Sequence, residues 1–341
     1  MIWLSWRQFR LQACVAAVTL ALFAAYLLYL GTDIRDAHAS ALTRCGRGGD
    51  CGQIMNQFQS GYQNTLLLLA AGLGLALALI GAFWGAPLVA REFEAGTHRL
   101  VWNQSVTRRR WFASRLAFTV LAGAITAGAA GALLTWAAAP VDEAAGNRFS
   151  TVLFGSRDLV PAAYAVFAVV FGAVVGLLVR RTLPAMAITL VGFLAFQFFV
   201  PNVIRSHLMA PQRTTLAMTA EAVNQARNLG NFSGDAVIGG ITVPGRPDAW
   251  VSRTSPLLTA DGDPLEKSAF NACLDDPPKT DTRGTFGDTA ACLGGLGLHL
   301  EVDYHPGGRY WAFQWRETGL YLLLSGLLTA FGLWRVRRGP S

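Results

Sequence analysis

The sequence predicts a mainly α-helical, polytopic membrane protein with six transmembrane helices and a small α+β extracytoplasmic domain between helices 5 and 6. The first observation is composition: 52% of the 341 residues are hydrophobic and 14% are charged, whereas soluble domains carry about 25% charged residues. The second is segregation of the charges, which leaves apolar runs of about 18 residues or more, long enough to cross a bilayer. The third is a long polar stretch, residues 204–316, between the fifth and sixth runs.

The apolar runs divide the chain into three parts. They occupy residues 11–30, 66–89, 112–139, 160–179, 184–203 and 318–334. We expect residues 1–203 to contain an N-terminal interfacial helix and transmembrane helices 1–5, with a cytoplasmic loop at 90–111. Residues 204–316 would form the extracytoplasmic domain, and residues 317–341 transmembrane helix 6 and a basic cytoplasmic tail.

The distribution of arginine predicts which way the spans face. Six spans place both termini on one side, where the short segments carry Arg7, Arg10, Arg91, Arg99, Arg108, Arg109, Arg110, Arg115, Arg180, Arg181, Arg335, Arg337 and Arg338. The short segments opposite carry Arg35, Arg44, Arg47, Arg148 and Arg157. Because short cytoplasmic segments are enriched in basic residues, we expect both termini in the cytoplasm.

The basic character of the chain reflects topology rather than nucleic-acid binding. The net charge is +7, but the arginines lie beside apolar runs instead of forming a phosphate-binding stripe. Lys267 and Lys279 are the only lysines, and alanine and glycine are abundant. This usage is typical of a GC-rich bacterial genome, so we expect a multi-pass protein of a bacterial inner membrane, with the lipid bilayer and no nucleic acid among its partners.

The N-terminus allows two interpretations. Residues 37–39, Ala-His-Ala, fit a small-residue signal cleavage site, and cleavage there would remove the first span. The apolar stretch is longer than the roughly 7–15 residues of a signal core, so an uncleaved span is the better interpretation. Before it, Trp3, Trp6 and Phe9 recur every three residues and indicate a short amphipathic helix in the membrane interface.

The cysteines provide an independent check on the topology. Cys14 falls in the first span, Cys45 and Cys51 in the first external loop, and Cys273 and Cys292 in the large external segment. Even numbers of external cysteines suit an oxidising compartment, so we expect the pairs Cys45–Cys51 and Cys273–Cys292. Pairing between the two loops and four free thiols remain alternatives, because connectivity cannot be read from sequence.

The polar stretch 204–316 is too long for a simple connector. Residues 236–243 and 298–304 read as short strands, and residues 215–228 as a helix. In a strand at 298–304, alternation places one set of polar side chains on one face: His299, Glu301, Asp303 and His305. These residue types can ligate zinc, but an amphipathic strand with a solvated face is the better interpretation, and we expect no metal site.

The loop at 90–111 carries the most specific pattern. After the second span the chain reads Glu-Phe-Glu-Ala-Gly-Thr, then a Thr-Arg pair, then the third span; the residues concerned are Glu92, Glu94, Gly96, Thr97, Thr107 and Arg108. This pattern, with six spans and an amphipathic N-terminal segment, resembles the type-2 exporter class of ABC transporter permeases. The long last external segment departs from many members, so handling of substrate outside the membrane can differ here.

The resemblance implies partners and a role for the loop. In that family the loop forms a coupling helix that docks into a separate nucleotide-binding subunit, and two such subunits bind ATP and Mg to move two permeases. The contact residues here would be Glu92, Glu94, Gly96, Thr97, His98 and Arg99. Neither lysine stands in a Gly-Lys-Ser/Thr context, so ATP hydrolysis is expected only in a partner subunit. We expect no enzyme activity, no cofactor and no catalytic residue in this chain, and a homodimer of permeases.

Few polar groups lie within the predicted spans. The fifth contains an aromatic cluster with one amide, formed by Phe193, Phe196, Gln197 and Phe198, which suits a path for an amphipathic or hydrophobic cargo such as a drug, lipid or peptide. Packed or lipid-facing phenylalanines are the plainer interpretation. The leading function is therefore a permease for outward transport. The alternatives are a membrane sensor that binds a ligand with residues 204–316, and a membrane-embedded enzyme using His207 or the Asp303–His305 pair.

Overall fold

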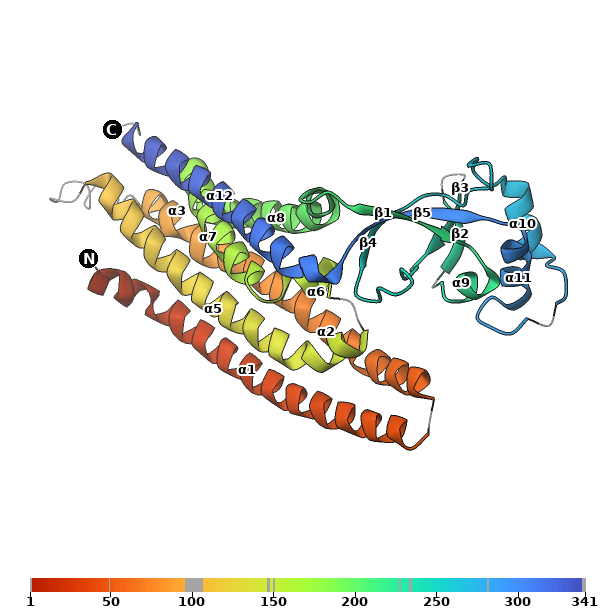
Figure 1. Ribbon diagram of the computed structural model, residues 1–341. Helices are drawn as coiled ribbons and strands as arrows, with labels where there is room; N and C mark the ends of the chain where they lie inside the picture. Colours follow the sequence, from red (N-terminus) through yellow and green to blue (C-terminus); the bar gives the residue numbers. More distant parts are fainter. Residues whose placement is uncertain are drawn as a thin grey trace. The chain divides into compact units, whose positions relative to one another are not determined.

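The computed structural model describes residues 2–48, 50–95, 107–145, 148–149, 151–226, 228–232, 235–280 and 282–338. The chain forms two compact units (Figure 1). The helical unit comprises Met1–Leu208 and Trp311–Ser341; the second unit, which we call the external unit after its predicted location, comprises Met209–Tyr310. The external unit therefore begins and ends within the stretch 204–316, and several residues at each end of that stretch belong to the helical unit.

Within its described residues, the helical unit holds six helices that are long and apolar enough to cross a membrane. Its elements are α1 (Ile2–Gly46), α2 (Cys51–Ile80), the π-helix η1 (Gly81–Gly85), α3 (Pro87–Glu94), α5 (Arg108–Ala145), α6 (Thr151–Gly155), α7 (Val160–Val179), α8 (Thr182–Phe199), the π-helix η2 (Val200–Ile204), the 3-10 helix η3 (Arg205–His207) and α12 (Tyr310–Arg337). Helices suit these segments because they satisfy every interior backbone group without water. The predicted mainly α class with six spans is confirmed.

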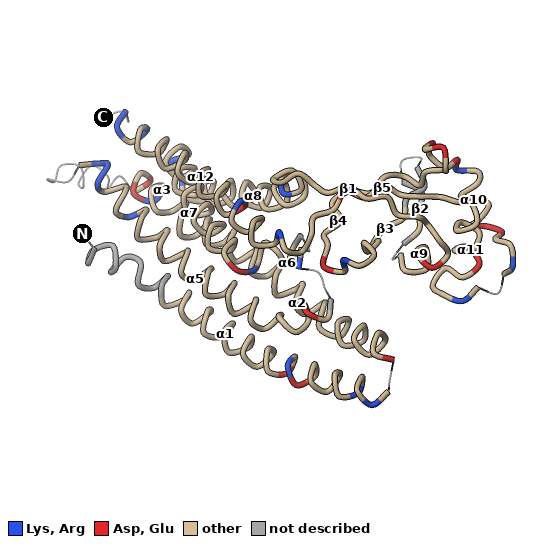
Figure 2. Tube along the Cα trace, in the orientation of Figure 1, with Lys and Arg blue, Asp and Glu red and all other residues tan. Residues whose placement is uncertain are grey.

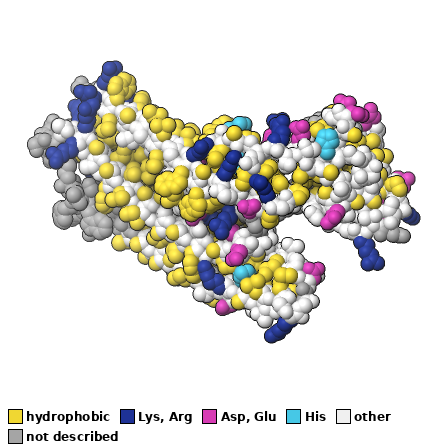
Figure 3. All heavy atoms as spheres, viewed as in Figure 1, with side chains coloured by type: hydrophobic (Ala, Val, Ile, Leu, Met, Phe, Trp, Pro, Cys, Tyr) yellow, Lys and Arg dark blue, Asp and Glu magenta, His cyan; other side chains and the backbone are white. Residues whose placement is uncertain are grey.

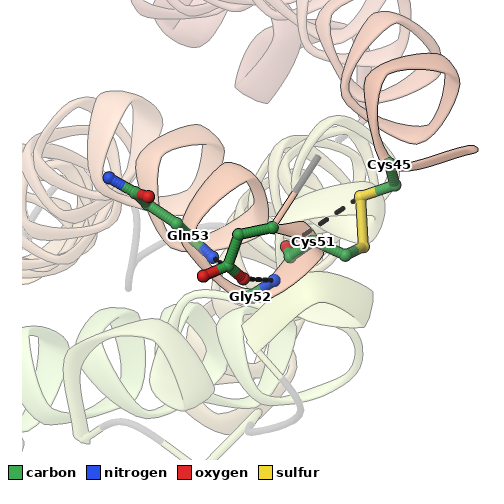
Figure 4. Close-up of a disulfide and its surroundings, with 5 residues drawn as sticks. Cys45, Cys51, Gly52 and Gln53 are labelled. Carbon is green, nitrogen blue, oxygen red and sulfur yellow. Dashed lines mark hydrogen bonds between the residues drawn. A yellow bond between two sulfur atoms is a disulfide. The ribbon is translucent and has the colours of Figure 1, made fainter. Parts of the chain in front are cut away.

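The first two helices extend well beyond the apolar runs that predicted them. α1 continues to Gly46 and α2 starts at Cys51, so the expected external loop is largely helical. Asp50 caps α2 by accepting hydrogen bonds from the backbone N–H groups of Gly52 (3.0 Å) and Gln53 (3.3 Å). Figure 4 shows the disulfide between Cys45 and Cys51 beside this cap. Cap and disulfide together hold the hairpin closed.

Span 2 and α7 meet along two facing pairs of glycines. In α2–η1 these are Gly81 and Gly85, and in α7 they are Gly172 and Gly176. A Cβ added to any of the four would approach backbone atoms of the other helix to under 3.0 Å. Small residues spaced four apart allow such backbone contact between membrane helices. The π-helix η1 ends two residues before Pro87, and a local π adjustment is one way a membrane helix accommodates a proline, whose ring clashes with the carbonyl group four residues earlier.

A left-handed residue separates the fourth and fifth spans. Arg180 ends α7 with φ 57° and donates its backbone N–H to the carbonyl oxygen of Gly176. Arg181 then adopts an extended conformation, and α8 begins at Thr182. The two arginines therefore form a tight turn between antiparallel helices, and the basic pair that predicted the cytoplasmic side is also the break between the helices.

The external unit is a small α+β domain. Its elements are β1 (Gln212–Ala217), α9 (Ala220–Asn224), β2 (Asn228–Phe232), β3 (Asp235–Gly239), β4 (Trp250–Thr254), α10 (Lys267–Asp275), α11 (Gly287–Gly295), β5 (His299–His305) and the 3-10 helix η4 (Gly307–Arg309). The antiparallel sheet has the order β1-β5-β4, and β2 and β3 form a separate pair. In the first pairing Gln212 lies opposite Tyr304 and Ala217 opposite His299. The predicted strand at 298–304 is thus the centre of the sheet.

The prediction of one helix over residues 215–228 is wrong. Thr214 and Thr215 belong to β1, where they pair with Val302 and Glu301 of β5, and only Ala220–Asn224 is helical. β-branched residues favour a pleated strand, and pairing with β5 outweighs the local helical pattern. Thr219 caps the start of the short helix, because its side chain accepts a hydrogen bond from the N–H of Ala222.

A disulfide links α10 and α11 in the core of the external unit. Cys273 is bonded to Cys292, and Cys273 is buried with Phe270, Leu293 and Leu300. Both disulfides follow the within-loop pairing preferred from sequence. In the first turn of α11, Asp288 accepts hydrogen bonds from the hydroxyl and N–H of Thr280, which lower the pKa of its carboxyl.

We expect loss of the Cys273–Cys292 bond to destabilise the external unit selectively. The double variant Cys273→Ser/Cys292→Ser should lower its free energy of unfolding by about 3 kcal/mol, because the bond closes a loop of 19 residues. Pulse proteolysis of the full chain across a urea series, with cleavage mapped to residues 209–310, measures this. The matched variant Cys45→Ser/Cys51→Ser should leave that transition unchanged, and an equal loss in both would contradict the expectation.

Candidate coupling segment and buried polar cluster

The segment α3 continues span 2 at the end of the helical unit that carries the basic ends of α5 and α12 (Figure 2). Its apolar side is buried. Val89 packs in one cluster with Phe112 of α5, Ala173 of α7 and Val336 of α12. This packing fixes α3 against three spans, so that any displacement of α3 acts on all of them.

Glu92 binds a neighbouring span rather than facing solvent. Its Oε1 accepts a hydrogen bond from Nη1 of Arg115 in α5 at 2.8 Å, and the two side chains are only 13% and 11% exposed. The Arg115 guanidinium also lies 4.9 Å from the centroid of the Trp111 ring. A partly buried pair is weakly screened by salt, so this contact is a strong tie between α3 and α5.

Glu94 caps another helix of the same chain. Its Oε2 accepts hydrogen bonds from the backbone N–H of Thr182 (3.0 Å) and from its hydroxyl (2.5 Å). Thr182 is the first residue of α8, and a carboxylate at a helix N-terminus satisfies unpaired N–H groups and interacts favourably with the helix dipole. Next to it, the Arg180 guanidinium lies 5.4 Å from the Phe93 ring. Glu94 therefore ties α3 to α8.

The structure places two of the six expected coupling residues. Gly96, Thr97, His98 and Arg99 lie outside the described residues. Glu92 and Glu94 both bind side chains or backbone of this chain, which the sequence did not indicate. A hint was present, because Arg115 and Thr182 stand at the cytoplasmic ends of their predicted spans, level with the two carboxylates.

The four aromatic-cluster residues of α8 point in different directions. Phe193 is buried and packs edge-on against Tyr164 with ring centroids 6.4 Å apart, and Phe196 packs against Phe167 at 5.0 Å. The amide of Gln197 lies against Gly74 of α2, where a Cβ would overlap it. Phe198 is exposed on the outer surface. Phe193, Phe196 and Gln197 pack α8 against α7 and α2, whereas Phe198 faces outward, and the role of the four residues as a substrate path stays a prediction.

A buried ionic cluster joins α7, the end of the fifth span and α12. Glu317 of α12 accepts hydrogen bonds from Nε (2.7 Å) and Nη2 (3.1 Å) of Arg205 and from the hydroxyl of Tyr164. Both charged side chains are 0% exposed. The Arg205 guanidinium also stacks on Phe154 of α6, 4.2 Å from its ring centroid. Such a pair holds its elements together because each charge, once buried, depends on the other.

Further buried polar contacts surround this cluster. Arg157, in the turn before α7, forms an ion pair with Asp142 of α5, and both are buried. The side-chain amide of Gln314 accepts from the N–H of Val160 and donates to the carbonyl of Phe154, both at 3.3 Å. These bonds secure α6 and the start of α7 to the beginning of α12.

Tryptophans on α12 show how deep the cluster lies. Trp311 and Trp315 are exposed near the start of the helix and Trp334 near its end. Trp315 and Trp334 are 19 residues apart, about 28 Å along a helix, which matches a hydrocarbon core of about 30 Å between two aromatic belts. Figure 3 shows hydrophobic side chains over much of the described surface of the helical unit. By this spacing Glu317, two residues after Trp315, lies near one end of the sixth candidate span.

The polar face of β5 is occupied by an arginine. Nε of Arg213 lies 2.9 Å from Oδ1 of Asp303, and its Nη1 lies 3.4 Å from Glu301; the hydrogen bond to Asp303 raises the pKa of Arg213. His305 is buried, with its ring beside Trp250. Across the described parts of the chain, no group of three or more His, Cys, Asp or Glu residues could hold a metal ion.

These features define a class of protein and then a family. Six long apolar helices, with a small sheet domain between the fifth and sixth, make the chain a multi-pass membrane protein. Residues 17–205, more than half of the chain, match the family described as ABC-2 membrane transporter related, and the chain belongs to that family. Membrane components of this family generally work with an ATPase partner and lack catalytic activity of their own. No curated protein and no solved structure matches the chain.

Proposed function

We propose that this chain is the permease subunit of an ATP-driven exporter in a bacterial inner membrane, with both termini in the cytoplasm. Two copies of the permease pair with two copies of a separate nucleotide-binding subunit, which binds ATP and Mg. The cargo is an amphipathic or hydrophobic molecule that moves outward. The family match over residues 17–205 carries this proposal.

The surroundings of α3 support a coupling role for it. It stands at the basic end of the helical unit, which the positive-inside rule assigns to the cytoplasm. Ties from Glu92 to α5 and from Glu94 to α8 connect it to the third and fifth spans. A force applied by an ATPase at the segment after Glu94 would reach the bilayer through these ties. In this proposal Glu92 and Glu94 transmit motion, and Gly96, Thr97, His98 and Arg99 contribute the docking contact.

Mild-detergent purification of the tagged protein from its own host tests the assignment. We expect a P-loop ATPase to copurify in stoichiometric amount, with hydrolysis that depends on the permease. Another partner, such as a kinase, or no partner in several mild detergents would contradict the proposal and favour a sensor.

Charge reversal separates a transmitting role from a docking role in the same complex. Glu92→Arg should reduce permease-stimulated ATPase activity at least tenfold, the equivalent of about 1.4 kcal/mol, because it faces Arg115 at a partly buried position. The swapped pair Glu92→Arg/Arg115→Glu should recover most of the activity if the residue acts through α5. Failure of the swap to recover activity, with ATPase binding lost, would show that Glu92 contacts the ATPase directly.

A further inference from the structure

A cavity of about 720 Å³ opens between α1, α2–η1 and α5. Its floor is formed by buried side chains of the bundle, including Leu73, Leu77 and Ala127. Exposed side chains such as Val15 and Leu68 form its rim. All three walls belong to helices that the hydropathy assigns to the membrane. The cavity is therefore open to hydrocarbon.

The lining of the cavity is almost entirely apolar. Its residues are aliphatic, aromatic or small apart from Thr19, Thr126 and the indole of Trp84. The Thr126 hydroxyl already donates to the carbonyl oxygen of Ala122 in its own helix at 2.8 Å. A headgroup or an ionised cargo buried here would lose its hydrogen bonds to water without replacement. Only an apolar moiety suits this surface.

The shape of the cavity favours a single alkyl chain. Along α2–η1 the lining runs from Leu68 to Trp84, about 24 Å at 1.5 Å per residue. A hydrocarbon chain in extended form can follow a groove of this length, and the apolar lining along it suits such a chain.

We propose that this cavity binds one acyl chain of a bilayer phospholipid, with the headgroup remaining at the membrane surface. The site is independent of the proposed export function, because it needs only the bilayer around the helical unit. A lipid held here bridges α1, which contacts the bundle through α5 and α2, to span 2, whose continuation is α3. It thereby fills the space beside the helix that carries the coupling segment.

A glycine in the wall provides a variant that fills the cavity without disturbing the fold. Gly72 of α2 lines the cavity, and a Cβ added there meets nothing within 4 Å. Gly61 of the same helix also has open space around an added Cβ and does not line the cavity. Gly72→Leu therefore occludes the site, and Gly61→Leu is its matched control. Thermal unfolding of both variants checks that neither is destabilised.

The full chain is reconstituted in phosphatidylethanolamine–phosphatidylglycerol vesicles with a trace of phosphatidylglycerol bearing a diazirine in mid-chain. After illumination, adducts are mapped by peptide mass spectrometry. We expect adducts concentrated on the cavity-lining parts of α1, α2 and α5, falling roughly tenfold in Gly72→Leu, a change of about 1.4 kcal/mol in binding, and unchanged in Gly61→Leu. The exposed face of α12 around Leu323 reports general lipid contact.

Two results would overturn the proposal. Equal labelling of the cavity and of α12, insensitive to Gly72→Leu, would show that lipid visits the cavity only as it visits any outer surface. Efficient disulfide formation between Gly72→Cys residues of two copies, with no cavity labelling, would show that a second copy covers it. Export assays do not enter either readout, so failure of the export assignment leaves this test intact.

Discussion

Glu317→Ala is expected to lower the free energy of unfolding of the helical unit by about 3–5 kcal/mol, the usual loss when one partner of a buried ion pair is removed. The substitution leaves the Arg205 guanidinium buried and unpaired, and it removes the acceptor of the Tyr164 hydroxyl. Water cannot replace the carboxylate readily, because both charged side chains are 0% exposed. Unfolding of the detergent-solubilised chain by titration with dodecyl sulfate measures the change.

A second variant separates the cost of leaving the Arg205 guanidinium unpaired from the cost of lost side-chain packing. The triple variant Arg205→Met/Glu317→Leu/Tyr164→Phe removes every polar atom of the contact together and should be more stable than Glu317→Ala alone, because apolar replacement of a whole buried pair is often near neutral. Glu143→Ala, at an exposed position of α5, should change stability by less than about 0.5 kcal/mol. A triple variant as unstable as Glu317→Ala would show that the loss does not come from leaving the Arg205 guanidinium unpaired.

This ion pair is the part of the helical unit that sequence reasoning missed. Uncharged runs identified all six spans, yet those runs end near residue 203 and begin again at residue 318, so Arg205 and Glu317 fell just outside them. In the structure the helices continue through both residues. A charge inside a span is acceptable when an opposite charge neutralises it, and hydropathy cannot register such pairing. The sequence did carry one signal of this pair, because Arg205 and Glu317 are opposite charges at similar depth in the fifth and sixth spans.

The predicted coupling segment shows the same limit. The pattern of residues 92–97 identified which loop to examine, but periodicity does not show what a carboxylate binds. Glu92 is bound by Arg115 and Glu94 by Thr182. These partners lie on spans that only tertiary packing brings next to α3. In the external unit, the strand at 298–304 was predictable from alternation, whereas β1 formed at the expense of a predicted helix because of its pairing with β5.

Gly172→Leu is expected to separate span 2 from α7 and to lower the free energy of unfolding by roughly 3 kcal/mol or more, at or above the upper end of ordinary overpacking. A Cβ at this position would overlap the carbonyl oxygen of Gly81 and the backbone nitrogen of Ala86. Backbone atoms cannot rotate away as a flexible side chain can, so the helices themselves must move. Dodecyl sulfate titration measures this loss as well.

The control for this substitution is Gly326→Leu in α12, where an added Cβ meets nothing within 4 Å and leucine is the better helix former. Its stability should therefore equal or slightly exceed that of the native chain. Because α3 begins at Pro87, immediately after the contact between Ala86 and α7, Gly172→Leu should also reduce ATPase stimulation in the fraction that remains folded. Full stability in Gly172→Leu would mean that the close glycine contact between span 2 and α7 does not support the fold. Normal ATPase stimulation despite lost stability would mean that motion of α3 reaches the bilayer through α5 and α8 alone.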